Sequence, residues 1–248
     1  MKDNPVWRES LDVYFGEGHG FAVYFYMLVI LAPVEFLSLY VPSLDAQMWS
    51  GSASLFKVSA ITALVLMVYF ALRVANQEFA PWRFKPLKHW LRDQAQPVDS
   101  VSRAQLYFLL VHVGVSLLLC GPFLIWAGAI ARTPLAIIAL TLLLLPFYAL
   151  TYGVWGLATL ALWERRIESR QVFIRSFFVC LVFLSALFYL PLNPVAFVLA
   201  LLSRQELPPL SLFSWQWSGT MVHLTFHFFL GAVGYATHRW ALARRPLL

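Results

Sequence analysis

Residues 134–163 read PLAIIALTLLLLPFYALTYGVWGLATLALW, a stretch without a single charged side chain. An α-helix needs about 20 apolar residues to cross the hydrocarbon core of a bilayer, so this stretch is long enough to span it. The whole chain of 248 residues has the same bias, since 60% of its residues are hydrophobic, 12% are charged and its mean hydropathy is +0.71. Soluble domains carry roughly a quarter of charged residues, so the composition predicts an integral membrane protein.

Five further apolar segments accompany this stretch. They predict an all-α integral membrane fold of six transmembrane helices, forming a single domain over residues 1–248. The fifth segment is short and runs into Pro191 and Pro194, so we expect a broken or re-entrant segment over residues 193–219, before the last span, enclosed by protein or facing an aqueous cavity. The six segments lie at about 21–42, 53–75, 105–131, 134–163, 177–192 and 217–238.

The distribution of Lys and Arg predicts the orientation, because these residues accumulate in cytoplasmic loops. Of the 18 in the chain, fifteen fall at or beside the N-terminus, the loops 74–104 and 164–176, or the C-terminus, which six spans place on one side. Only Lys57, Arg132 and Arg204 fall on the other side. We therefore expect a multi-pass protein of the cell's inner (cytoplasmic) membrane with both termini in the cytoplasm. Because the basic residues flank apolar runs, a nucleic-acid partner is not expected.

Two of the polar segments have helical character. Residues 1–20 place apolar side chains near helical spacing with charged residues between them, which predicts an amphipathic helix at the cytoplasmic interface; a polar leader without regular structure is the alternative. The loop 76–104 is too long for a simple turn, and its prolines predict short helices. Its aromatic and basic residues suit two uses, lying on anionic lipid or presenting a helix to a soluble partner.

Sequence motifs for catalysis are absent. The chain has no G-x-x-x-x-G-K-[ST] phosphate loop, no G-x-S-x-G and no H-E-x-x-H, so we expect neither ATP hydrolysis nor another enzymatic activity from this chain alone. Cys120 and Cys180 lie inside apolar runs without C-x-x-C spacing, which indicates packing residues rather than a redox pair or a metal site.

Four polar residues within the apolar segments are candidates for a translocation path. A charged side chain at membrane depth costs about 3 kcal/mol, so Glu35 is either paired, protonated or facing a cavity, or it lies close enough to the outer headgroups to stay solvated. His223 and His227 are four residues apart and share a helix face, and His112 lies in the third segment. Such histidines either hydrogen-bond between helices or hold a b-type haem that passes electrons to or from quinone.

The loop also carries a family resemblance. It reads HWLRDQAQPVDS over residues 89–100, and with Trp90, Pro97 and Val98 in register it resembles the coupling segment of the permeases of type-2 ATP-binding-cassette (ABC) transporters. The family's leucine run after the tryptophan is replaced here by Arg92, Asp93 and Gln94. Three other stretches of the chain also resemble this family. They are NPVWRESLDVYF from residue 4, GVWGLATLALWERRIESRQVFIRSF from residue 153 and LPLNPVAFVLALLSRQ from residue 190.

The resemblance implies a transmembrane permease subunit, of the exporting kind, that pairs with a second permease subunit, identical or related. A separate soluble dimer of ATPase subunits would bind ATP and magnesium, so no cofactor is expected on this chain. The b-type haem subunit is the alternative from another class. The residues that the resemblance implies for coupling to the ATPase are Trp82, Lys88, Trp90, Leu91, Arg92, Pro97 and Val98.

Overall fold

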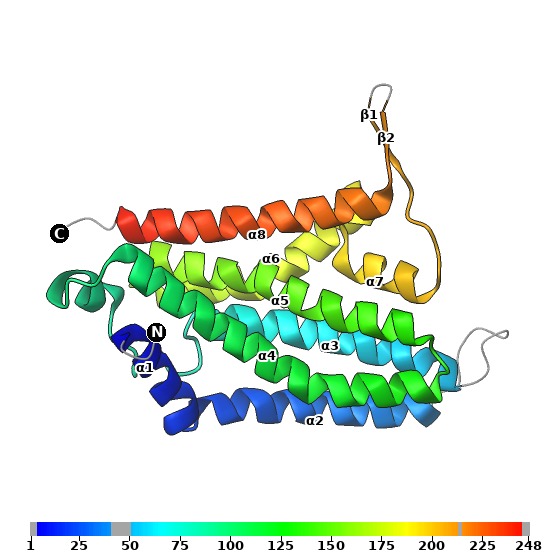
Figure 1. Ribbon diagram of the computed structural model, residues 1–248, viewed down its shortest axis with the longest axis horizontal. Helices are drawn as coiled ribbons and strands as arrows, with labels where there is room; N and C mark the ends of the chain where they lie inside the picture. Colours follow the sequence, from blue (N-terminus) through cyan, green and yellow to red (C-terminus); the bar gives the residue numbers. More distant parts are fainter. Residues whose placement is uncertain (1–3, 41–50, 213–214, 245–248) are drawn as a thin grey trace.

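The computed structural model describes residues 4–40, 51–212 and 215–244, and these are almost entirely helical (Figure 1). The predicted all-α class holds except for a short antiparallel hairpin in which Leu210 pairs with Trp217. The elements in chain order are α1 Pro5–Leu11, the π-helical η1 Asp12–Gly16, α2 His19–Tyr40, α3 Gly51–Ala75, the π-helical η2 His89–Asp93, α4 Val98–Ile130, α5 Leu135–Leu162, α6 Ile167–Phe188, the 3-10 turn η3 Leu190–Leu192, α7 Pro194–Leu202, β1 Leu210–Leu212, β2 Trp215–Trp217 and α8 Gly219–Ala243.

Five helices, α2 to α6, are long and apolar enough to cross a membrane. Large apolar side chains on them remain exposed, among them Leu118 at 76% and Phe188 at 83%. Only lipid or another apolar surface covers side chains of this kind favourably. The chain is therefore a multi-pass membrane protein, as its composition predicted.

The sixth predicted span, 217–238, coincides with α8. This helix has 25 residues and runs along the length of the bundle beside α5, so it is long enough to span (Figure 1). It is less apolar than the other five because it carries His223, His227 and His238. The structure thus bears out five spans by length and composition, and the sixth stays a prediction.

Two helices begin before the apolar segments that the sequence predicts for them. Helix α4 begins at Val98 rather than near residue 105, and α6 begins at Ile167 rather than near residue 177, so the loops 76–104 and 164–176 are shorter than expected. The helical turns that precede each apolar segment carry polar side chains, so hydropathy alone does not assign them to the helix. A helix continues through them because its backbone hydrogen bonds do not depend on side-chain polarity.

The segment 193–219 contains the short helix α7 and the hairpin. Asn193 is the N-cap of α7, because its side-chain oxygen accepts hydrogen bonds from the backbone N–H groups of Val195 and Ala196 at 2.9 and 3.0 Å. Pro194 occupies the first helical position, where its missing N–H costs nothing. The structure thus shows a separate short helix and a hairpin here, while a broken or re-entrant membrane segment stays a prediction.

The two ends of the bundle differ in charge. Helix α1, the loop 76–97, the turn 163–166 and the C-terminal end of α8 lie at one end, called here the basic end (Figure 1). The turn after α4, α7 and the hairpin lie at the other. Of the fifteen residues predicted on the cytoplasmic side, Lys2 and Arg245 lie outside the described residues. At the opposite end, the Lys57 ammonium donates to Ser203 Oγ at 3.0 Å.

Helices α3 and α5 form the centre of the bundle. They approach closely at Gly156, where an added β-carbon would lie only 2.4 Å from the carbonyl oxygen of Leu72. The Asn76 side-chain amide locks this crossing, since its Nδ2 donates to the Gly156 carbonyl at 3.2 Å and to Thr159 Oγ1 at 2.8 Å. Small residues at a crossing let two backbones pack closely, which replaces the hydrophobic driving force that is missing between helices in lipid.

Candidate functional site

The predicted coupling loop contains a short helix over residues 87–93 that lies against the basic end. One face of this loop helix is apolar and buried, with Leu87 2% and Trp90 5% exposed. These two side chains join a compact apolar cluster with the ends of four helices. The other buried members of this cluster are Val6 from α1, Val101 and Ala104 from α4, Leu160 and Ala161 from α5, and Ala241 and Leu242 from α8.

Two carboxylates from the N-terminal segment hold the loop in place. The backbone N–H of Lys85 donates to Glu9 at 2.9 Å, and the Arg83 guanidinium makes a bidentate ion pair with Glu17. Burial raises the pKa of Glu9 above its ordinary value, whereas the hydrogen bond from Arg83 lowers the pKa of Glu17. The N-terminal segment therefore forms a helix, α1, and its carboxylates hold the loop, while its position at the membrane interface stays a prediction.

A third carboxylate holds the loop from the opposite side. Glu164, in the turn between α5 and α6, accepts a hydrogen bond from the backbone N–H of Leu87. At the start of the chain, Asn4 caps α1 by accepting from the N–H of Val6, and its Nδ2 donates to Ser100 Oγ at 2.9 Å in α4. The loop helix is therefore tied to α1, to η1 and to the α5–α6 turn.

The sequence interpretation missed these tethering residues. A usable signal existed, because the chain has only 12 acidic residues and five of them lie in two short polar segments, residues 1–20 and 163–166. The Asn-Pro pair at residues 4–5 is also a helix-start pattern, with an N-cap followed by proline at the first helical position.

The part of the loop that precedes the loop helix also carries a tryptophan. Trp82 is 75% exposed, although tryptophan is costly to leave in water. Trp90, which the resemblance implies as a coupling residue, is instead turned into the bundle and unavailable to a partner. Of the other residues implied for coupling, Lys88, Arg92 and Pro97 are exposed, and Leu91 and Val98 are half-buried.

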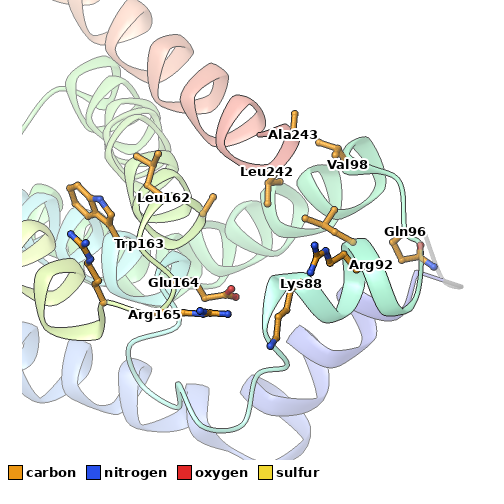
Figure 2. A pocket seen from close by; sticks show the side chains of 13 residues that line it. Lys88, Arg92, Gln96, Val98, Leu162, Trp163, Glu164, Arg165, Leu242 and Ala243 are labelled. Carbon is orange, nitrogen blue, oxygen red and sulfur yellow. The ribbon is translucent and has the colours of Figure 1, made fainter. Parts of the chain in front are cut away.

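A cavity of about 730 Å³ opens between the loop helix, the end of α5, the turn 163–166 and the end of α8 (Figure 2). We call it the basic pocket, because four cationic side chains line it against one carboxylate. Figure 2 shows Glu164 and Arg165 extending from the turn toward Lys88 and Arg92 of the loop helix. The cationic lining residues are Lys88, Arg92, Arg165 and Arg166, and the carboxylate is Glu164.

Within the bundle, the four translocation-path candidates separate into two groups. Glu35 of α2 is only 1% exposed, so protein encloses it rather than the headgroup region. Its carboxyl group lies near Ser59 of α3 and Cys120 of α4. His112 of α4 lies on the same side of the bundle, where its Nδ1 is 3.1 Å from the hydroxyl of Tyr24 in α2.

The second group joins α5 to α8. His223 Nδ1 lies 2.6 Å from the Pro191 carbonyl, and because a carbonyl only accepts, Nδ1 donates and Nε2 accepts from the Tyr148 hydroxyl at 2.5 Å. In the same way His227 donates to the His223 carbonyl and accepts from Tyr152 at 3.2 Å. Each imidazole thus uses both ring nitrogens in hydrogen bonds to the protein, which favours the interhelical hydrogen-bonding alternative.

Removing the hydroxyl of Tyr148 tests this pairing. Tyr148→Phe leaves the buried His223 Nε2 without its donor, and we expect it to destabilise the folded protein by about 1 kcal/mol. Thermal unfolding of the detergent-solubilised protein measures the effect. The matched control is Tyr107→Phe, at a tyrosine that is 46% exposed. Equal midpoints for the two variants would show that the hydrogen bond contributes nothing.

The comparisons with known proteins add no relative. No protein-family model, no curated protein and no solved structure matches this chain. The resemblance of the loop to a coupling segment thus has to be judged on the geometry of the basic end. Among the described residues, no three His, Cys, Asp or Glu side chains gather as metal ligands would.

Proposed function

We propose that this chain is the transmembrane permease subunit of an ABC transporter, and that it works as an exporter. A separate dimer of soluble ATPase subunits binds ATP and magnesium, and it docks on the loop helix. The observation that carries the proposal is that the loop has two kinds of surface. Its helix buries Leu87 and Trp90 against the bundle, while Trp82, which precedes the helix, and basic side chains of the helix are exposed. Exposed aromatic and basic residues of this kind are enriched where proteins bind one another.

The packing of the loop helix supports a mechanical role. Its buried face contacts the ends of α1, α4, α5 and α8 together, so a displacement of the loop acts on four helices at once. The tethers from Glu9, Glu17 and Glu164 keep the loop from swinging free of the bundle. Closure of the ATPases on ATP would then move the helix ends and open or close the path.

The proposed topology follows the charge distribution. The basic end faces the cytoplasm of a cell with an inner membrane, α1 lies at the interface, and α8 is the sixth span, which brings both termini to the cytoplasmic side. The segment 193–219 re-enters the outer leaflet. A second permease subunit covers part of the apolar surface of the bundle, and Glu35 and His112 contribute to the path.

The test is copurification of an ATPase with the affinity-tagged chain from its own host. We expect the wild type to retain an ATPase subunit and Trp82→Ala to lower the retained amount about tenfold, because an exposed interface tryptophan contributes strongly to binding. Trp82 is exposed, so its loss leaves the bundle folded. Trp126→Ala, at another exposed tryptophan near the opposite end of α4, is the matched control.

Two results would overturn the proposal. One is a wild-type chain that retains no ATPase, and the other is a Trp82→Ala variant that retains as much as Trp126→Ala. An absorption spectrum of the same preparation checks the haem alternative, because bound b-type haem gives a strong Soret band and the permease proposal predicts none.

A further inference from the structure

The basic pocket gathers several positive charges at the basic end of the bundle. Four cationic side chains face one carboxylate, and Lys88, Arg165 and Arg166 are all exposed to a ligand entering from outside. Whatever ion pairs form within the pocket, one carboxylate cannot neutralise four cations. The pocket therefore has a net positive charge and attracts anions.

The rest of the lining is apolar. Leu162 ends α5 and is 40% exposed, and Leu242 comes from the last turn of α8. Because the two helices end here, the pocket lies where the hydrocarbon-spanning part of the bundle gives way to the headgroup region. A ligand that fits has an anionic part for the cations and an apolar part for the leucines.

We propose that the basic pocket binds the headgroup of an anionic phospholipid. Arg165 and Arg166 of the turn hold phosphate from one wall, and Lys88 and Arg92 of the loop helix hold it from the other. Basic pockets between membrane helices at the cytoplasmic side suit such headgroups. With two pairs of cations and about 730 Å³ of space, the pocket favours a lipid with two phosphates over a lipid with one.

The bound lipid would connect the two walls of the pocket, the turn 163–166 and the loop helix. The turn 163–166 continues α5 and α6, while the loop helix receives the partner. Glu164 already connects them through the N–H of Leu87, and a phosphate between the cationic walls adds a second connection. The inference requires only a membrane and not an ATPase, so it stands or falls independently of the proposed function.

Native mass spectrometry of the purified chain in detergent tests the inference without any partner. Cardiolipin, phosphatidylglycerol and phosphatidylcholine with matched acyl chains are titrated separately. We expect cardiolipin to bind tightest, phosphatidylglycerol next and zwitterionic phosphatidylcholine weakest. Arg165→Gln with Arg166→Gln is expected to weaken cardiolipin binding about 30-fold, the effect of two cations near a membrane surface.

The matched control removes two charges elsewhere. Arg103 lies at the basic end outside the pocket and Arg132 lies at the opposite end, and both are exposed. Arg103→Gln with Arg132→Gln is expected to bind cardiolipin like the wild type, and circular dichroism confirms that both double variants are folded. Equal weakening in the two double variants, or equal affinity for all three lipids, would overturn the inference. Displacement of cardiolipin by millimolar inorganic phosphate would assign the pocket to a soluble anion instead.

Discussion

Gly156→Ala is expected to destabilise the protein by about 3 kcal/mol, the upper range for overpacking a well-packed interface. The new β-carbon would lie 2.4 Å from the Leu72 carbonyl oxygen and 2.9 Å from the β-carbon of Ala75. Neither atom belongs to a flexible side chain, so α3 and α5 must separate. Separation also lengthens the two hydrogen bonds that Asn76 donates across the crossing.

A thiol-reactive fluorophore measures this effect during heating. Cys120 is buried and Cys180 is exposed, so in a Cys180→Ser background the dye reports the unfolding that uncovers Cys120. Gly114→Ala is the control, because a β-carbon there has no neighbour within 4 Å and alanine is the better helix former. Equal thermal unfolding midpoints for Gly156→Ala and Gly114→Ala would show that α3 and α5 tolerate a β-carbon at Gly156.

Trp90→Ala is expected to free the loop helix from the bundle. Truncating a buried tryptophan costs about 3 kcal/mol or more, and here the loss falls on a small cluster at the basic end rather than on the central helices. Because opening of the loop becomes easier by that amount, cleavage by trypsin after Lys88 and Arg92 is expected to accelerate on the order of 100-fold.

Limited trypsin digestion followed by mass spectrometry gives the rate at each site. Trp82→Ala removes the same side chain from an exposed position of the same loop, so it is expected to leave these cleavage rates near the wild-type values. If the two variants are cut equally fast, the loop helix is not held by Trp90. The far-ultraviolet circular dichroism of Trp90→Ala should remain that of a helical bundle.

The spans were the most predictable part of the fold. Helix α5 lies within one residue of the stretch 134–163, because an uninterrupted apolar run has few competing interpretations. The starts of α4 and α6 were not predictable in this way. Their first turns carry charged residues, and Arg170 is even buried, although its charge suggested a solvated loop.

The site was predictable in outline only. Composition indicated an amphipathic loop, but the direction of Trp90 depends on how Val6, Val101 and Leu242 meet, and these residues are far apart in sequence. The pairing of His223 with Tyr148 and the Pro191 carbonyl likewise needs three elements to converge. Spacing showed that His223 and His227 share a face, yet it contains no information on what that face meets.

Helix α4 has 33 residues and measures about 50 Å, while the hydrocarbon core of a bilayer is about 30 Å thick. The helix is longer than the core is thick, and its first two turns, with Asp99 and Arg103 exposed, lie in water. These turns continue without a loop into the apolar part of the helix. Helix α4 therefore crosses the membrane surface as one continuous helix, without a hinge at that level. If the start of α4 tilts next to the loop helix, the part of α4 inside the lipid tilts with it.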